Sequence, residues 1–382
     1  MMDRYLINDV ENGIEVRVSE FRPTASDTAA KEYCAMLTST RQGRRFDEEI
    51  EALLNACGTL RHKLGENVKP VFKRYFLSDP ANQSPLLPAD AECAVSVIGQ
   101  SPLDGSRVAV WIYLVEGAEV TGLHNGFYRV NHGDFTHYWQ GGAHIAGADS
   151  ETATRRLLDD YSRIMSEHGC ALGRDCARTW FFVRDVDVNY AGLVRGRNAV
   201  FAENGLTSDT HFIASTGICG SGVDRTVTVT MDTYTIKGLQ SGQMRYLYAP
   251  THLNPTYEYG VAFERGTAID YADRRHVLIS GTASIDNRGN VVHPGDIVRQ
   301  TLRMWENVET LLQEAGCGYD DVMHMIVYLR DIADFRTVHD MLRQRFPNTP
   351  RVIVLAPVCR PEWLVEMECM AIRPAATGFG AF

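Results

Sequence analysis

The sequence has no long apolar run, no excess of basic residues and no apolar leader. In its 382 residues, no segment approaches the ~18 consecutive apolar residues that a membrane-spanning helix needs. The first residues, MMDRYLINDVENGIEV, contain no apolar signal region, so export is not expected. The 38 Lys and Arg are outnumbered by 48 Asp and Glu. The resulting net charge of −10 argues against a uniformly basic surface for nucleic acid or lipid headgroups.

Paired cysteines and nucleotide-binding glycines are also missing. The nine cysteines are scattered, odd in number and free of any C-x-x-C pair, which disfavours a disulfide framework or a zinc knuckle and fits a reducing cytoplasm. The glycines of GGAHIAG and STGICGSG do not form G-x-G-x-x-G. His132, His137 and His144 lie close in sequence, but a metal site needs more convergent ligands. We therefore expect no metal and no cofactor.

What the chain does contain is a pattern that occurs three times. An amphipathic helix runs through a glycine-containing turn into an apolar strand, and the strand ends read FLSD, FVRD and YLRD, finishing at Asp79, Asp185 and Asp331. Each copy continues into a second strand-rich piece. At roughly 150 residues per domain the length corresponds to about 2.5 domains. The repetition predicts three units, at 1–120, 121–252 and 253–382.

Each unit is predicted to be a small α+β domain with helices on one face of a sheet. Between Val298 and Leu312, apolar residues recur every three or four positions, which indicates one face of a helix. From Thr226 to Thr233, polar and apolar residues alternate, which is typical of a half-buried strand. Chance self-similarity is the alternative, but the same order of pieces returns three times.

The third unit resembles the Rid (YjgF) family. The resemblance lies in SGTASIDNRGNVVHPGD, the helix QTLRMWENVETLLQEAG, the strand IVYLRD and the closing VEMECMAI. Rid proteins are usually homotrimers with ligand sites in the clefts between subunits. The resemblance implies an α+β fold of three tandem Rid-like (chorismate-mutase-like) α/β domains, packed as an intrachain pseudo-trimer. Such a chain is expected as a monomer or as a homo-oligomer of the pseudo-trimer.

The second and third units together also resemble chorismatases, which are built from two diverged Rid-like domains. The matching stretches are RTWFFV, GRNAVF, IASTGI, QMRYLYAPTHLNPTYEYGVAFERGT and VCRPEWLVEME. Chorismatases cleave the enolpyruvyl ether of chorismate and release pyruvate and a hydroxylated ring acid. The loop DNRGNVVHPGD and the stretch YAGLVR depart from their pattern, and the first unit has no obvious counterpart in them. The resemblance implies an active cleft between the second and third units.

Glu366 is the candidate general acid. In a strand, Glu366 and Glu368 share one face, and two carboxylates roughly 7 Å apart on a partly buried sheet raise the pKa of one of them. The resemblance selects Glu366, because chorismatases use the Glu seven residues beyond the Cys of C-R, and Glu366 keeps that spacing from Cys359. The pattern alone also fits two solvated carboxylates on an edge strand.

Arg360, Arg351 and Arg197 are the expected binding partners of substrate carboxylates, because a bidentate guanidinium offsets carboxylate desolvation. Arg360 follows Cys359 as in chorismatases, and Arg351 has the position of the arginine with which Rid deaminases bind an enamine or imine acid. Arg178 is a weaker candidate. An arginine in a loop is equally compatible with a surface role. Cys359 is expected to line the site, since no nearby base is visible to activate its thiol.

Three functions remain open from the sequence. The preferred one is a chorismatase-like lyase or hydrolase acting on chorismate or a related cyclic carboxylate, which needs no cofactor because a carboxylic acid can protonate a polarised enol ether unaided. The second is a Rid-type enamine/imine deaminase that anchors its substrate on Arg351. The third is a non-catalytic protein that binds a small acid. The expected partner is a small-molecule carboxylate, with no nucleic acid and no membrane.

Overall fold

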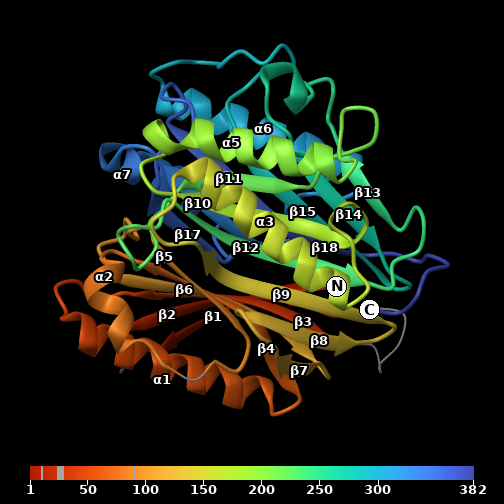
Figure 1. The fold of residues 1–382 in the computed structure, drawn as a ribbon. Helices are drawn as coiled ribbons and strands as arrows, with labels where there is room; N and C mark the ends of the chain where they lie inside the picture. Colours follow the sequence, from red (N-terminus) through yellow and green to blue (C-terminus); the bar gives the residue numbers. More distant parts are fainter. Residues whose placement is uncertain (10–11, 24–29, 90) are drawn as a thin grey trace.

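The protein consists of three six-stranded mixed sheets, each with helices on its outer face (Figure 1). This architecture is that of a computed structural model, which describes residues 1–9, 12–23, 30–89 and 91–382. The α+β class and the three repeated units are confirmed. Among the described helices, none is long and apolar enough to cross a membrane.

The first unit has the strand order β1-β2-β3-β6-β4-β5, in which β4 and β5 are parallel and the other neighbours antiparallel. The long helix α1 packs on β2, β3 and β6. The elements are β1 (Met2–Asp9), β2 (Ile14–Phe21), β3 (Glu32–Ser39), α1 (Phe46–Leu64), β4 (Val68–Leu77), the short α2 (Pro80–Gln83), β5 (Ala94–Gly99) and β6 (Val108–Glu116).

The second unit repeats this plan with the order β11-β10-β12-β9-β8-β7, in which β10 and β11 form the parallel pair. Two long helices, α3 and α5, pack against each other on its outer face (Figure 1). The elements are β7 (Glu119–Gly122), β8 (Phe127–His132), β9 (Phe135–His144), α3 (Ser150–Glu167), α4 (Leu172–Asp175), β10 (Cys176–Val183), α5 (Val186–Glu203), β11 (Ser215–Cys219) and β12 (Val229–Lys237).

The third unit has the order β13-β14-β15-β18-β16-β17, with β16 and β17 parallel. Its first strand, β13, precedes the expected boundary at 252 and pairs with β14, so the third sheet begins earlier in the chain than that boundary. The elements are β13 (Met244–Leu247), β14 (Gly266–Asp270), β15 (Arg274–Ala283), α6 (Ile297–Glu314), β16 (Val322–Leu329), α7 (Phe335–Arg345), β17 (Arg351–Leu355) and β18 (Val365–Pro374).

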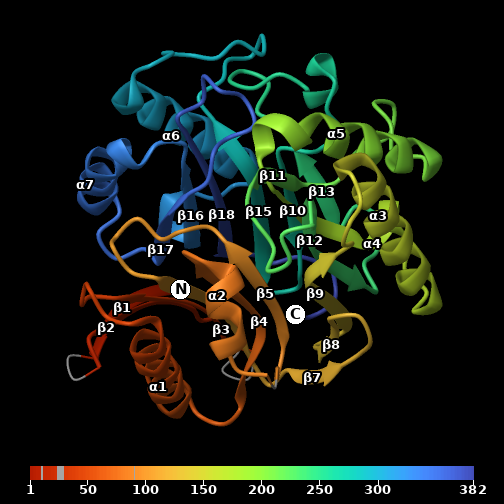
Figure 2. The ribbon, with the colours of Figure 1, turned by 60° about the vertical axis from the view of Figure 1, so that its left-hand side comes forward.

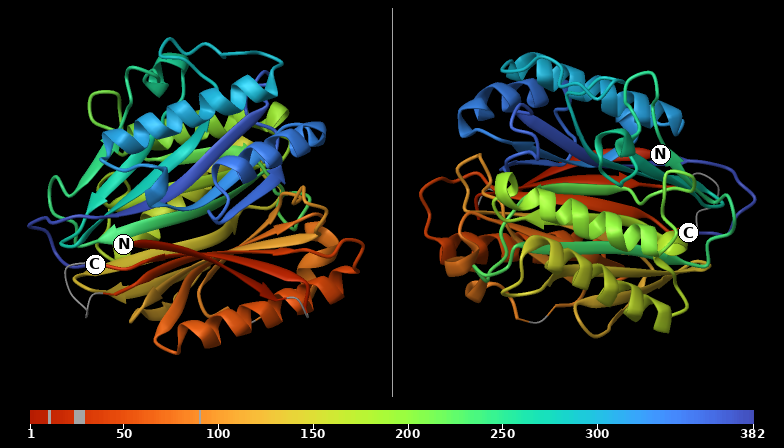
Figure 3. Two further views of the ribbon diagram at one scale, coloured as in Figure 1. Left: turned by 180° about the vertical axis from the view of Figure 1, so that it is seen from behind. Right: turned by 45° about the horizontal axis from the view of Figure 1, so that its top comes forward.

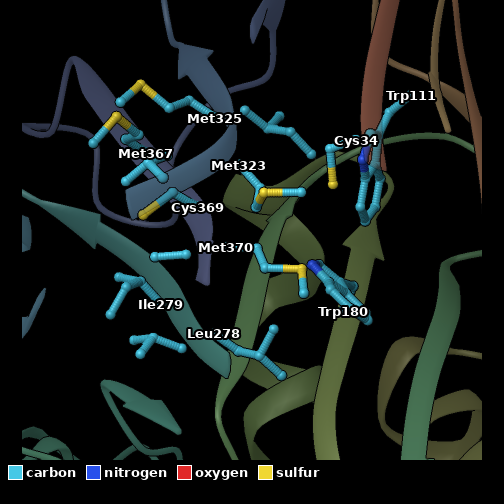
Figure 4. Close-up of a cluster of buried hydrophobic side chains, with 14 of the residues drawn as sticks. Cys34, Trp111, Trp180, Leu278, Ile279, Met323, Met325, Met367, Cys369 and Met370 are labelled. Carbon is cyan, nitrogen blue, oxygen red and sulfur yellow. The ribbon is translucent and has the colours of Figure 1, made fainter. Parts of the chain in front are cut away.

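The inner faces of the three sheets meet at the centre of the molecule, and the helices lie outside (Figures 2 and 3). Side chains from all three units form one buried cluster there, including Trp111 of β6, Trp180 of β10 and Met370 of β18 (Figure 4). A separate cluster lies under α1, and another under α3 and α5. Removing this apolar surface from water is the main favourable term in joining the units.

Central packing also changes the expected burial of the alternating strand. The sequence predicts a half-buried strand over 226–233, but β12 begins at Val229 and both of its faces are buried. Thr230 and Asp232 are at most 3% exposed. The prediction of a solvent-facing polar side was wrong, because that side faces the other two units.

The helix predicted over 298–312 is present as α6, and Trp305, Val308 and Leu312 are buried as expected. The beginning of the helix does not follow the expected face. Val298 and Leu302 are 43% and 44% exposed, whereas Gln300 is fully buried. The Gln300 amide donates to the carbonyl oxygens of His293 and Glu362. These hydrogen bonds compensate the burial of the amide, so a polar residue takes an inward position.

Candidate active site

A cavity of about 190 Å³ lies between the second and third units. The second unit contributes residues of α5 and β11, and the third contributes β15, β18 and the loops before β14 and β18. Four of the five residues predicted for the site line it: Glu366, Arg360, Arg197 and Cys359.

Glu366 lies on β18, between β15 and β16, where it pairs with Ala283 and Tyr328. The side chain is buried, and its wall is Gly281, where a Cβ would lie 2.2 Å from Oε1 of Glu366. Glycine is needed here for space, since any larger residue would displace the carboxyl group. Burial first, and then the neighbouring Glu368 carboxylate, raise the pKa of Glu366 to about 8. The group is therefore a protonated acid at neutral pH.

Glu368 has the opposite environment, although it lies on the same strand. Its carboxylate accepts hydrogen bonds from the Arg178 guanidinium at 3.0 Å, the Trp180 indole at 2.9 Å and the Thr216 hydroxyl at 2.5 Å. Charge-assisted hydrogen bonds of this kind stabilise the ionised form. The strand thus presents one acid to the cavity and holds the other as a partnered anion behind it.

Three guanidinium groups line the cavity and are interleaved with aromatic rings. Arg360 lies 4.7 Å from the ring centroids of both Tyr259 and Trp363. Arg265 lies 5.4 Å from the ring of Phe263, and Arg197 lies 5.7 Å from the same ring. Stacking on aromatic faces holds these cations in place without neutralising their charge.

Buried nitrogen atoms at this site lack hydrogen-bond partners. Arg197 is 1% exposed, and its Nε and Nη2 have no acceptor among the described residues; the same is true of Nε of Arg265. Burial lowers the pKa of Arg197 from its usual value. A buried donor without a partner costs about 1–3 kcal/mol, and more when charged. An anionic ligand would supply the missing acceptors.

We predict that Arg197→Met weakens binding of an anionic ligand about 10- to 100-fold, because a charged hydrogen bond contributes about 1.5–3 kcal/mol. Isothermal titration with the substrate, or KM, measures the change. Arg195→Met is the matched control, since Arg195 lies on the same helix but is exposed and paired with Glu151. Equal losses in both variants would show that the effect is structural.

Cys359 faces the cavity as a neutral thiol. Burial raises its pKa to about 12, and the adjacent Glu366 adds to the rise. A nucleophilic cysteine needs the thiolate form. Cys359 lines the cavity in its neutral form, which is the role expected for it.

Arg351, the fifth predicted residue, lies elsewhere. It begins β17 and lines a second cavity of about 80 Å³ with Glu15, Arg17 and Thr38 of the first unit. Its Nη1 donates to the carbonyl oxygens of Phe346 and Thr349. The structure thus does not bring Arg351 to Glu366, because β17 is the sheet edge that faces the first unit. Arg178 bonds Glu368 and does not line the cavity either.

Sequence reasoning missed several residues of the site, above all Arg265. This arginine directly precedes β14, in the joint between the second and third units, and is 4% exposed. Its position at the joint was the available signal. Tyr190 and Tyr259 gave none, because nothing in the sequence indicates that α5 and the loop before β14 face each other.

The acid is specific to the third unit. The strand ends FLSD, FVRD and YLRD align the units, and the register then pairs Phe76 with Ala109, Phe182 with Thr230 and Tyr328 with Glu366. The positions equivalent to Glu366 thus carry a methyl group and a hydroxyl group in the first two units. Of the three equivalent positions, one can donate a proton from a carboxyl group.

The third unit matches a family model described as endoribonuclease L-PSP over residues 267–373. A RutC family protein of Pyrococcus abyssi is 32% identical over 99 residues, which are 25% of this chain and 78% of the relative. A RutC family protein of Saccharolobus solfataricus is 37% identical over 97 residues, 25% of this chain and 77% of the relative. The 3-aminoacrylate deaminase RutC of Acinetobacter baylyi is 31% identical over 97 residues, again 25% and 77% of the two chains.

A crystal structure of a chorismatase is similar in fold to this protein. The match has a TM-score of 0.68 and 18% sequence identity, and covers 91% of this chain and 100% of that chain. A match of that extent reaches into the first unit, so the expectation that this unit has no counterpart in chorismatases was wrong. The fold and the relatives of its third unit together place this chain in the Rid (YjgF, RutC) family, as a tandem pseudo-trimer.

Proposed function

We propose that the protein is a chorismatase-like enzyme that cleaves the enolpyruvyl ether of chorismate or a related cyclic carboxylate. One observation carries the proposal: a buried carboxylic acid whose pKa is raised to about 8 shares one cavity with three guanidinium groups. A cavity of about 190 Å³ suits a small molecule. Cleavage of an anionic enol ether requires both a proton donor and cations that bind the carboxylates of the substrate.

The reaction begins with proton transfer from Glu366 to the terminal methylene carbon of the enolpyruvyl group. An oxocarbenium ion results, and Glu366 becomes a carboxylate that the positive charges of Arg265 and Arg178 stabilise. Water adds to the cation and loses a proton, which returns to Glu366, and the product is a hemiketal. The hemiketal hydroxyl group then loses its proton as its oxygen becomes the keto oxygen of pyruvate. The ring oxygen takes up a proton as its bond to that carbon breaks, which releases pyruvate and a hydroxylated ring acid.

The arginines select the substrate by charge. With Glu366 protonated, Arg197, Arg265 and Arg360 leave the cavity with an excess of positive charge. A ligand with two carboxylates supplies acceptors for the unpartnered nitrogens of Arg197 and Arg265. Incubation with chorismate and a coupled pyruvate assay tests the proposal; wild-type protein that releases no pyruvate contradicts it.

The second cavity supports a second candidate function. Arg351 and Arg17 both line it, and burial together with the nearby Arg17 lowers the pKa of Arg351 to about 10. Arg17 is paired with Glu15 at 2.6 Å, so Arg351 is the guanidinium group that a small carboxylate would bind here. Such a site fits an enamine or imine deaminase that anchors its substrate on Arg351 and hydrolyses it with water.

We predict that Arg351→Met separates the two candidates, since the two cavities have no lining residue in common. If the deaminase is right, ammonia release from 2-aminoacrylate falls by an order of magnitude or more, because the carboxylate loses its anchor. Pyruvate release from chorismate stays within about twofold of wild type. Loss of pyruvate release with retention of ammonia release contradicts this division. Inactivity in both assays, with tight binding of a small acid, favours a non-catalytic protein.

A further inference from the structure

Four buried charged groups meet where the three units join. Arg74 comes from β4 of the first unit, Arg178 and Asp232 from the second, and Glu368 from β18 of the third. Each side chain is at most 4% exposed. Two cations and two anions leave this group, which we call the hub, without net charge. Neutrality matters here, because an unpaired charge is costly in a buried site.

Arg74 joins the first unit to both others. Its Nη2 and Nε donate to Oδ2 of Asp232 at 2.8 and 3.2 Å. Its Nη1 lies 3.7 Å from Oε1 of Glu368 and has no hydrogen-bond acceptor among the described residues. Four aromatic rings surround the guanidinium group, at 4.9 to 5.5 Å, and belong to Phe72, Trp111, Trp180 and Phe182. Trp111 and Trp180 are visible in Figure 4.

The hub is connected to the candidate acid by one short path. The Thr216 hydroxyl donates to Glu368 at 2.5 Å and accepts the backbone N–H of Gly281 at 2.9 Å. Gly281 in turn is the wall against which the Glu366 carboxyl group lies. Through Thr216, the position of Glu368 therefore fixes the wall of the cavity. It also fixes the place of the Glu368 carboxylate relative to Glu366.

The tyrosine, cysteine and histidine side chains beside the hub and beside Glu366 are uncharged at neutral pH, whereas Arg197, Arg265 and Arg360 are the cations that line the cavity. Burial raises the pKa of Tyr328 far above its usual range and that of Cys369 likewise, and burial lowers the pKa of His324 to about 3. Cys359, beside Glu366, is also a neutral thiol. Arg265 and Arg178 are the cations that act on Glu366. Glu368 is thus the negative charge that opposes ionisation of Glu366.

We propose that the hub positions the candidate acid: arginines from the first and second units hold the Glu368 carboxylate, which through Thr216 holds the Gly281 wall against which Glu366 lies. Arg74 and Glu368 are then positioning residues, and the first unit takes part in positioning the acid although none of its described residues lines the cavity. This inference rests on the proposed role of Glu366 as general acid.

The test is a pH titration of the Glu366 carboxyl group by ¹³C NMR in the full chain, together with the pH profile of kcat/KM. Glu368→Gln removes the like charge and leaves an excess cation, so we expect the pKa of Glu366 and the pH limit of activity to fall by about one unit or more. Glu368→Gln/Arg74→Gln removes that cation too. Because Arg178 and Asp232 still balance, the pKa of Glu366 should rise part of the way back.

The matched control is Glu368→Gln/Arg155→Gln, since Arg155 is exposed and pairs with Glu203 on the surface. This control should behave as Glu368→Gln alone. The double variant with Arg74 also guards against misfolding, because its buried charges balance. An unchanged pKa of Glu366 in Glu368→Gln, or no difference between the two double variants, overturns the inference.

The two proposals fail in distinguishable ways. Suppose the pKa of Glu366 shifts as expected, but neither the variants nor wild-type protein release pyruvate. The proposed role of the hub is then supported, and the proposed reaction is contradicted. Suppose instead that pyruvate release requires Glu366, but the pKa of Glu366 is the same with and without Glu368. The proposed reaction is then supported, and the proposed role of the hub is contradicted.

Discussion

Glu366→Gln is expected to reduce pyruvate release about 10²- to 10⁴-fold, which is the usual contribution of a positioned general acid. Glutamine has nearly the same shape but cannot donate a proton to carbon. Because the change is isosteric and the cavity keeps its arginines, substrate affinity should change little. The loss should therefore appear in kcat rather than in KM. Equal rates in wild type and Glu366→Gln would show that the assignment of the acid is wrong.

The same assignment predicts a pH profile. The acid is active when protonated, and its pKa is raised to about 8. For wild-type protein, kcat/KM should stay level below pH 8 and fall about tenfold per pH unit above it. Glu362→Gln is the matched control, because Glu362 lies four residues away and is exposed. That variant should keep both the rate and the profile of wild type.

Glu366→Gln should also stabilise the protein, increasingly so between pH 4.5 and pH 8. In the unfolded chain Glu366 ionises at its ordinary value of 4.5, whereas in the folded protein it holds its proton to about 8. Between these values the folded state binds the extra proton, so wild-type stability decreases as pH rises. Glutamine has no proton to lose and avoids this cost. The 2.5-unit interval up to pH 7 corresponds to about 3 kcal/mol.

Thermal or urea unfolding of both proteins at pH 5 and pH 7 measures this effect. The difference in unfolding free energy should be small at pH 5 and grow toward pH 7 and pH 8. Glu362→Gln should follow wild type at every pH, since its side chain is exposed. A Glu366→Gln variant that is less stable than wild type at pH 7 would mean that the carboxyl group is ionised in the folded state.

The repeat and most of the site were predictable from the sequence because they depend on local patterns. The helix of α6, the strand ends at Asp79, Asp185 and Asp331 and the two-residue spacing of the glutamates are all properties of a short stretch of chain. Periodicity of this kind indicates which elements form. It does not give their packing partners, which is why Val298 and Leu302 were assigned to the wrong side of their helix.

The assignment of each arginine to a cavity could not be predicted from the sequence, because it too depends on packing partners. Arg351 and Arg360 are nine residues apart, yet they line different cavities, because β17 is the edge of its sheet beside the first unit and the next loop turns toward the second. Arg265 lines the cavity because its segment lies beside the second unit, where the carbonyl oxygen of Ile213 accepts the N–H of Glu264. Arg74 and Glu368 are separated by 294 positions and meet through packing of separate sheets.

Local patterns in the sequence indicate three related α+β units and two glutamates on one face of the last strand. The packing of the units then selects Glu366 to face the cavity and Glu368 to be held by Arg178. The physical reason is that burial and neighbouring charge, rather than residue type, set the protonation of a carboxyl group. The second unit and loops of the third unit bury Glu366, and the neighbouring charge is that of Glu368 on the same strand, which Arg178 of the second unit holds in place.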